Sequence, residues 1–392
     1  MTEPTRATQP DVDRTPAIPL FDLRLEPEDL HAVEDVLRSG WLTMGPRTRA
    51  FEEAFAAHLG CRHAVAVSSC TGALHLAYLA AGVGPGDEVI MPAFTFVATA
   101  AAAIHCGATP VLAEIVSPDE PNVDPEHVER LIGPRTKAVT AVHFAGFPAA
   151  VDELADLCER RGLALVEDAA HAPSTTLHGR KAGTWGLAGC FSFFSNKVLP
   201  AGEGGLLATD VDDVAARVRL LRSQGMTSGT WERHNRQTDT YDVVEPGFNY
   251  RTDELRSALL LSRLARLDAE IERRRELTRS YRERLRGVDG VLVPFADAAV
   301  DSASCYVMPI MLADPARRSD LRRVMRDEHG VQTSVLYPAL HEFSVWRSTL
   351  GDASLPRTEL AARSEVTLPL YPHMTAAELD AVFEALEDAL AR

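Results

Sequence analysis

Apolar residues recur along this chain with two different spacings. Near the start they recur every three to four positions in 26–40 and in 47–60, and both stretches end at glycine. This pattern predicts two amphipathic helices. From residue 63 onward, short apolar runs alternate with longer helical stretches. The predicted strands are 63–68, 87–92, 109–115, 137–144 and 163–169, and the predicted helices between them are 71–83, 95–107, 124–132 and 150–162.

This alternation is typical of an α/β fold in which helices cover both faces of a mostly parallel sheet. Two further strands, 189–194 and 205–210, follow one another without a helix between them, and a helix is predicted at 210–225. A polar loop at 227–251 separates this helix from a long charged one at 252–287. The last predicted elements are strands 305–312 and 331–337 and helices 316–330 and 375–392.

A chain of 392 residues is long enough for two domains with separate cores. We expect a disordered leader at 1–17, a large domain at 18–255 that binds a cofactor, and a smaller α+β domain at 256–392. The long charged helix would begin the small domain and link it to the large one.

The composition, 46% hydrophobic and 24% charged, is typical of a soluble globular protein. The 40 basic residues are outnumbered by 56 acidic ones, and the net charge of −16 argues against nucleic acid and anionic membranes as partners. The first residues are polar, no apolar stretch is long enough to span a bilayer, and the six cysteines form no CxxC pair. These features predict a cytoplasmic protein with reduced thiols.

The chain carries its positive charge almost entirely on arginine. Lysine occurs only at Lys137, Lys181 and Lys197. Lys137 and Lys181 lie in polar turns, where a solvated side chain is expected. Lys197 follows the apolar run CFSFF, and burial there would lower the pKa of its amine and make it a nucleophile. Lys197 is therefore the candidate catalytic lysine.

Two carboxylates, Glu167 and Asp168, end the predicted strand 163–169, at the edge where ligands of open α/β sheets bind. His171 follows closely. Other interpretations remain open at this point. Asp168 can be a helix cap and His171 a core histidine, whereas a metal site would need a third ligand that has no recognisable spacing here.

Small and hydroxylated residues precede the predicted helix 71–83. Ser69, Thr71 and Gly72 can form a phosphate site, because free N–H groups and the helix dipole converge at a helix N-terminus. A plain helix cap is the alternative. The chain has neither a Walker motif nor a strand-GxGxxG-helix fingerprint, which argues against a P-loop nucleotidase and against the usual dinucleotide site.

Together, a phosphate site, a strand-end carboxylate and a buried lysine are the groups needed to hold pyridoxal phosphate. The lysine would form a Schiff base with the cofactor. The carboxylate would keep the pyridine nitrogen protonated, so that the ring accepts electrons, and the helix N-terminus would bind the phosphate.

The same residues occur in a familiar order. The segments VEDAAHA, FSFFSNKVLPAGEGGLLATD and GFNYRTDELRSALLLSRL, supported by SSCTGALHLA, MPAFTFVATA and YPALHEF, resemble the DegT/StrS-type nucleotide-sugar aminotransferases, a branch of the fold-type I pyridoxal-phosphate enzymes. The resemblance extends from about residue 18 to about residue 390. It implies the aspartate-aminotransferase-like fold: a large domain with a seven-stranded, mostly parallel sheet between helices, and a smaller α+β C-terminal domain.

The resemblance also implies roles for single residues. Lys197 takes the position of the lysine that bonds to the cofactor, and Asp168 that of the partner of the pyridine nitrogen. The other implied cofactor contacts are Thr71, Gly72 and Ser192 at the phosphate, Phe96 stacked on the ring and His171 near the 3-oxygen. One departure is Val198, since many relatives have asparagine directly after the lysine.

Further positions match the substrate side and the subunit interface of the family. Asn249 matches a residue that reaches the partner's phosphate, which implies a homodimer with shared active sites. Tyr337 and His341 match the substrate side, although both can be structural. The diphosphate of a nucleotide-linked sugar needs cations to bind it. The candidates are Arg251 and the loop residues Arg233 and Arg236, although these can also be solvated charges.

The sequence therefore predicts a pyridoxal-phosphate-dependent aminotransferase. Its substrate would be a nucleotide-linked 3-keto or 4-keto deoxysugar, and its amino donor L-glutamate or glutamine, in the biosynthesis of a secondary metabolite, such as an antibiotic, or of a surface glycan. Two alternatives remain. The same fold can act on a keto-cyclitol of an aminoglycoside pathway, or the chain can be a non-catalytic regulator that binds the cofactor.

Overall fold

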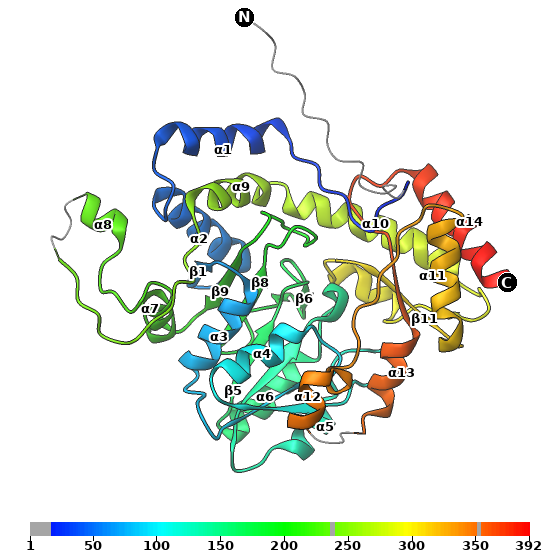
Figure 1. The fold of residues 1–392 in the computed structure, drawn as a ribbon, viewed down its shortest axis with the longest axis horizontal. Coiled ribbons are helices and arrows are strands. Elements are labelled where there is room, and N and C mark those ends of the chain that lie inside the picture. Colours follow the sequence, from blue (N-terminus) through cyan, green and yellow to red (C-terminus); the bar gives the residue numbers. More distant parts are fainter. Residues whose placement is uncertain (1–16, 236–239, 351–353) are drawn as a thin grey trace, which may run out of the picture.

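A seven-stranded sheet forms the centre of the computed structural model, which describes residues 17–235, 240–350 and 354–392 (Figure 1). Residues 1–16, most of the expected leader, lie outside the described residues. The strand order is β1-β9-β8-β5-β4-β2-β3, and only β9 runs antiparallel to its neighbours. The predicted α/β fold with a mostly parallel sheet is confirmed. The strands are β1 (His63–Val67), β2 (Glu88–Pro92), β3 (Thr109–Ala113), β4 (Thr136–Val142), β5 (Ala164–Asp168), β8 (Ala188–Ser192) and β9 (Gly205–Thr209).

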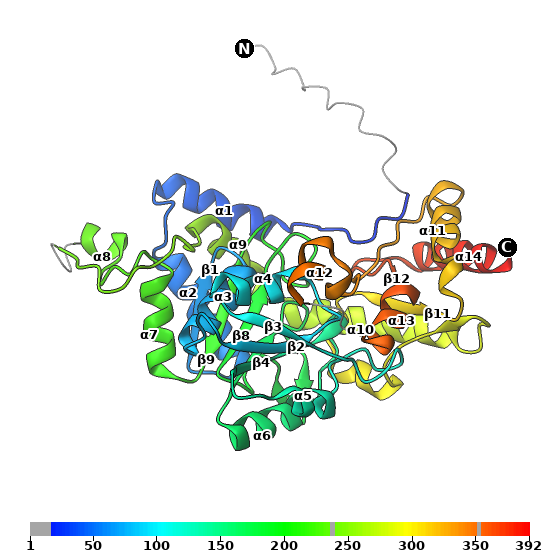
Figure 2. The same ribbon diagram turned by 60° about the horizontal axis from the view of Figure 1, so that its bottom comes forward.

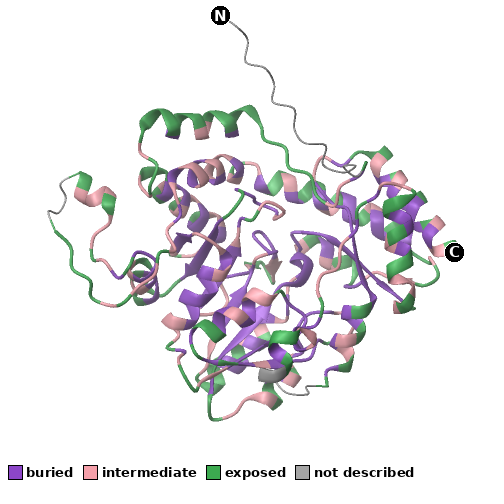
Figure 3. Cartoon of the chain, viewed as in Figure 1, coloured by how far each residue is buried: buried purple, intermediate pink, exposed green. Residues whose placement is uncertain are grey.

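Helices cover both faces of this sheet, as Figure 2 shows. Alternate strand residues face opposite sides, so Val65, Met91 and Val166 join one apolar cluster while Ile90 and Val139 join another. The first cluster includes α3 (Cys70–Ala80), α4 (Val97–His105) and α7 (Asp212–Leu221), and the second includes α5 (Pro125–Leu131) and α6 (Val151–Arg161). The strands are buried between these layers (Figure 3).

The two helices predicted near the start are α1 (Pro27–Ser39) and α2 (Pro46–Leu59). Gly40 and Gly60 end them with φ of 71° and 75°, a left-handed conformation that glycine adopts without a Cβ clash. In its described part, the expected polar loop 227–251 contains one short helix, α8 (Thr230–His234). A small hairpin, β6 (Thr176–Leu177) with β7 (Arg180–Lys181), was not predicted.

The stretch 252–287, expected as one helix, forms two: α9 (Glu254–Leu264) and α10 (Leu267–Leu285). Arg266 leaves the helical conformation between them, with φ −114° and ψ 4°. Its guanidinium binds the buried Asp29 of α1 and also Glu270, and these contacts fix the corner. α10 runs from the central sheet toward the C-terminal elements (Figure 1).

The C-terminal part is built on a three-stranded antiparallel sheet of β10 (Val291–Leu292), β11 (Met308–Leu312) and β12 (Glu365–Leu368). The strand predicted at 331–337 is wrong. That segment makes only isolated bridges, because Val331 pairs with Ile18 while Ser334 pairs with Thr367 of β12, so no continuous ladder forms. The helices here are α11 (Arg318–Asp327), α12 (Ser344–Leu350), α13 (Pro356–Ser364) and α14 (Ala376–Ala391). The division into domains at residue 255 stays a prediction.

No helix within the described residues has both the length and the apolar character needed to cross a membrane.

Candidate active site

A cavity of about 360 Å³ lies where β4, β5 and β8 reach their carboxyl ends, and we call it the Asp168 cavity. Its volume falls in the range of small-molecule sites. The residues around it come from strand ends, from the starts of α3 and α4, and from the segment after β8. Eight residues predicted from the sequence line it: Ser69, Thr71, Phe96, Asp168, His171, Ser192, Lys197 and Tyr337.

The two adjacent carboxylates at the end of β5 have different environments. Glu167 is fully buried and accepts hydrogen bonds from the N–H groups of Gly183, Trp185 and Gly186, as well as bonding to His143. Its oxygens are fully used in holding the next loop. Asp168 lines the cavity, and it accepts the Thr99 hydroxyl at 2.8 Å and the Ala170 N–H at 3.2 Å.

Burial raises the pKa of Asp168, although these hydrogen bonds and the nearby Lys197 amine oppose the rise. A cationic ring nitrogen at its free lone pairs would stabilise the carboxylate further. Asp168 is therefore the carboxylate that can pair with a ligand, whereas Glu167 has a structural role.

The amine of Lys197 faces the Asp168 cavity from the segment after β8. Its Nζ lies 4.4 Å from the centre of the Tyr306 ring. Burial lowers the pKa of Lys197 to about 8, although the nearby Asp168 opposes this shift. A neutral amine is thus accessible near neutral pH, as a nucleophile requires.

The other two lysines differ from Lys197 and, in part, from expectation. Lys137 is exposed but lies on β4 rather than in a turn. Lys181 is half-buried, with its Nζ 3.0 Å from Nε2 of His58, so the prediction of a solvated side chain was wrong for this lysine.

Aromatic rings line the cavity near Lys197. His171 stacks on Tyr306, with ring centres 4.3 Å apart, and its Nε2 lies 3.1 Å from the hydroxyl of Tyr337. Burial lowers the pKa of His171 well below its usual value, which keeps the ring neutral. The Phe96 ring is 53% exposed and lies 5.6 Å from that of Tyr337.

The N-terminus of α3 lies at the same cavity. Ser69 caps the helix by accepting the Gly72 N–H at 3.1 Å, and Thr71 lines the cavity in the first turn. Ser192 is on the facing strand end β8. Gly72 does not line the cavity; a Cβ there would lie 3.3 Å from the Tyr250 ring, so tight packing accounts for the glycine.

Three more predicted residues lie outside the cavity. Asn249 is exposed and bridges to Ser223. Arg251 lines a different pocket, with Met226 and Trp231 among its neighbours. His341 is buried against Glu359, with 3.3 Å between Nε2 and Oε1.

Of the two loop arginines, Arg233 bonds to Ser228 and covers the Tyr241 ring, and Arg236 lies outside the described residues. The structure therefore does not bring Arg233 or Arg251 to the Asp168 cavity.

Sequence reasoning missed Tyr306, Thr99 and Asn196. Tyr306 contacts both Lys197 and His171, and Thr99 donates to Asp168. Tyr306 gave no signal, because it lies in the predicted apolar strand 305–312, far from every motif. Thr99 lies inside MPAFTFVATA, where an inward-facing hydroxyl three residues into a helix could have been noticed.

The side chains present fit pyridoxal phosphate. Nδ1 of His171 is buried and has no hydrogen-bond partner among the described residues, so it can bond to a polar substituent of a ring lying on Asp168. The α3 N-terminus is suited to a phosphate, and the Lys197 amine to the aldehyde. When bound, the cofactor supplies the electron sink for moving an amino group.

Comparison with known proteins gives matches over nearly the whole chain. The family model of the DegT/DnrJ/EryC1/StrS aminotransferases matches residues 24–387. The chain is 38% identical over 368 residues to the spore coat polysaccharide biosynthesis protein SpsC of Bacillus subtilis (strain 168), covering 92% of this chain and 94% of SpsC.

Two solved structures extend the comparison. S. venezuelae DesV, in complex with a ketimine intermediate, is 36% identical with a TM-score of 0.87, covering 96% of this chain and 99% of DesV. NtdA from Bacillus subtilis, with bound cofactor PMP, is 28% identical with a TM-score of 0.83, covering 93% of this chain and 82% of NtdA.

Proposed function

Because this chain belongs to the DegT/DnrJ/EryC1/StrS aminotransferase family, and is thus a sugar aminotransferase that uses pyridoxal phosphate, we propose that it aminates a nucleotide-linked keto sugar. The sugar is a 3-keto or 4-keto deoxysugar, and L-glutamate or glutamine donates the amino group. The reaction takes place in the cytoplasm and serves the biosynthesis of a surface glycan or a secondary metabolite such as an antibiotic.

The observation that carries this proposal is the placement of Lys197 beside Asp168 in one cavity. Lys197 would hold the cofactor through its amine and, when that amine is free, would carry the proton that amino transfer requires. Its pKa of about 8 suits both tasks, since the amine can gain or lose a proton near neutral pH. Asp168 holds a proton on the pyridine nitrogen and so keeps the ring electron-poor.

The remaining cavity residues bind and orient the cofactor. Thr71 and Ser192, which line the cavity at the α3 N-terminus, would hold the phosphate, and Phe96 would pack against the ring. The neutral His171 is oriented by Tyr337 and bonds through Nδ1 to the ring substituent nearest to it. Tyr337 also lies on the substrate side.

We further propose that the protein works as a homodimer with shared active sites. Asn249 is exposed and lies outside the cavity of its own subunit, which supports a role at the partner's phosphate. Arg251 and His341 would contact the substrate in this dimer. Fully active monomers in solution would contradict this arrangement.

Separate half-reactions test the proposal. The purified holoenzyme is mixed with L-glutamate or L-glutamine, and conversion of the bound cofactor to its pyridoxamine form is followed by absorbance. Nucleotide-linked 3-keto and 4-keto sugars are then added, and the amino sugar is detected by mass spectrometry. We expect conversion in both steps, with one keto position strongly preferred.

Two results would contradict the proposal in different ways. If keto-cyclitols restore the pyridoxal form and nucleotide sugars do not, the substrate assignment is wrong. If no amino donor reacts while the cofactor stays bound, the chain is a regulator rather than an enzyme.

A further inference from the structure

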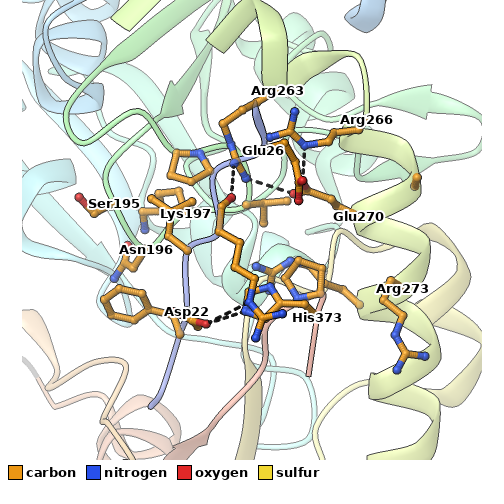
Figure 4. Close-up of a pocket in the computed structure, with 18 residues that line it drawn as sticks. Asp22, Glu26, Ser195, Asn196, Lys197, Arg263, Arg266, Glu270, Arg273 and His373 are labelled. Carbon is orange, nitrogen blue, oxygen red and sulfur yellow. Dashed lines mark hydrogen bonds and ion pairs between the residues drawn. The ribbon is translucent and has the colours of Figure 1, made fainter. Parts of the chain in front are cut away.

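A second cavity, of about 370 Å³, adjoins the Asp168 cavity, and we call it the Arg274 cavity. Asn196 and Lys197 line both cavities. The other walls come from segments far apart in the sequence: residues 21–26, the helices α9 and α10, and Pro372 with His373 (Figure 4). A ligand in the Arg274 cavity therefore lies beside the reactive lysine.

Charged side chains dominate this second cavity. Five arginines and three carboxylates line it, in a chain whose net charge is −16. The local surplus of cations is thus opposite in sign to the rest of the molecule. The arginines are Arg24, Arg263, Arg266, Arg273 and Arg274, and the carboxylates are Asp22, Glu26 and Glu270.

Four of these arginines have carboxylate partners. Arg263 and Arg266 each form ion pairs with Asp29 and Glu270, as Figure 4 shows in part. The exposed Arg273 pairs with Glu276, and the exposed Arg24 lies 3.7 Å from Asp22. The last pair is long and solvated, so it leaves Arg24 largely available to a ligand.

Arg274 is different. It is only 5% exposed, yet it forms no ion pair with a carboxylate among the described residues, whereas the other buried arginines, Arg222, Arg263 and Arg282, each have one. Arg274 donates from Nη1 to the carbonyls of Tyr306 and Leu370, at 3.2 and 3.1 Å.

Arg274 therefore has no carboxylate in direct contact among the described residues, although Glu270 lies near enough to act on its charge. Its Nε has no partner within the part of the chain that the structure describes. Burial lowers the pKa of Arg274 to about 10, although the charge of the nearby Glu270 opposes this shift. A buried cation without a directly paired carboxylate is costly, and a bound anion would offset that cost.

We propose that the Arg274 cavity is an oxyanion subsite, which binds the anionic group of a substrate that reacts at Lys197. This rests on the proposed function. Two parts of the substrates carry such oxyanions: the diphosphate of a nucleotide-linked sugar and the carboxylate of the amino donor. Arg274 also contacts the backbone of Tyr306, whose ring faces Lys197, so an anion at Arg274 is held next to the reacting amine.

The test is a binding measurement on the holoenzyme loaded with pyridoxamine phosphate, in which no transfer occurs. Thymidine diphosphate, uridine diphosphate and glutarate are titrated by calorimetry, with uridine and glutaramide as uncharged controls. We expect at least one of the anions to bind, more weakly as salt is raised, and the uncharged controls not to bind. Binding of a nucleoside diphosphate identifies the sugar diphosphate as occupant, and binding of glutarate identifies the donor carboxylate.

Three variants locate the bound anion. Arg24→Ala and Arg273→Ala change exposed residues, and each should weaken binding about two- to fivefold. Arg274→Lys keeps the charge but loses the planar fork, and should weaken binding about tenfold or more if it folds. Arg284→Ala is the matched control, because Arg284 lies on the same helix and pairs with Asp380 outside the cavity; its affinity should equal that of the wild type.

The subsite would be refuted if no anion binds the wild type, or if Arg24→Ala and Arg273→Ala bind as tightly as Arg284→Ala. Either result leaves the proposed function intact when the donor still converts the cofactor. Failure of that conversion, with anion binding unchanged, would instead overturn the proposed function and keep the subsite.

Discussion

The Asp168 cavity and the Arg274 cavity share Asn196 and Lys197 but differ in almost everything else. The first is lined mainly by aromatic, aliphatic and hydroxyl side chains, with Asp168 as its buried carboxylate. The second is lined by five arginines and three carboxylates. An apolar wall with a few placed polar groups suits a flat ring, whereas dense charge suits an oxyanion. Lys197 thus lies between a cavity suited to the ring of the cofactor and a cavity suited to an anionic group of the substrate.

Replacing the shared Lys197 should give the largest difference between the effect on amino transfer and the effect on anion binding. In Lys197→Ala, amino transfer should fall at least about thousandfold, because both the nucleophile and the proton carrier are lost. Anion binding in the Arg274 cavity should change less than about threefold, since the arginines remain. Borohydride should no longer label the cofactor onto the protein, because the amine that forms the Schiff base is gone. Single-turnover kinetics with the donor, calorimetry and the labelling measure these three effects.

The matched control is Lys137→Ala, which removes an exposed lysine on β4. It should leave the rate and the labelling unchanged. A Lys197→Ala protein that retained more than about a tenth of the rate would refute the catalytic assignment of the lysine.

The neighbouring carboxylates of β5 offer the next largest effect. Asp168→Asn should lower the rate of the donor half-reaction about hundredfold, because the ring nitrogen loses its anionic partner, with little change in melting temperature. Glu167→Gln should do the reverse: it should cost about 3 kcal/mol of unfolding free energy, since Glu167 accepts three backbone N–H groups within the fold. Kinetics and denaturant unfolding of both variants are compared, and equal effects on rate would contradict the distinction.

The pH dependence of cofactor capture tests the environment of Lys197 directly. Burial lowers its pKa to about 8, so the neutral amine increases about tenfold per pH unit up to that value and then levels off. The rate at which cofactor-free protein captures pyridoxal phosphate should follow this curve in stopped-flow absorbance. A rate still rising steeply above pH 9 would mean that the amine behaves as an ordinary solvated lysine.

The same contrast explains what could be predicted from the sequence. The Asp168 cavity forms at strand ends, and ends of parallel strands meet at one edge of a sheet, so the short segments around Asp168, Ser192 and Lys197 could be brought together without coordinates. The α/β fold followed in the same way from the alternation of strands and helices. Tyr306 could not be found, because it reaches the cavity from the C-terminal sheet by tertiary packing alone.

The Arg274 cavity could not be predicted from the sequence either, because tertiary packing alone brings its residues together. Its walls come from four separate segments, and an arginine on a charged helix such as α10 looks solvated in the sequence. The break between α9 and α10 was also missed, because it depends on the contact of Arg266 with Asp29, which is more than two hundred residues away in the chain. Such long-range ion pairs leave no local pattern.

The smallest expected effect concerns Glu365, a fully buried carboxyl on β12. It accepts the N–H of Leu336 at 2.6 Å and the hydroxyl of Thr367 at 2.5 Å. Leu336 and Tyr337 line the Asp168 cavity but not the Arg274 cavity, so a change at Glu365 should reach only the first. Glu365→Gln should therefore alter the donor half-reaction by a few-fold and leave anion binding unchanged.

The dependence of protein stability on the titration of Glu365 gives the sharper measurement. Burial raises the pKa of Glu365 to about 8, against the opposing charges of Arg318 and Arg322. The folded protein therefore holds a proton that the unfolded chain releases near its ordinary pKa, and stability is lost as pH rises from about 5 to about 8. Glutamine does not titrate, so the wild type should lose stability relative to Glu365→Gln over this range in urea unfolding. Glu384→Gln changes an exposed carboxylate and serves as the control. If the stability of the wild type and that of Glu365→Gln changed equally with pH, Glu365 would be ionised throughout, and its hydrogen bond with Leu336 would not depend on pH.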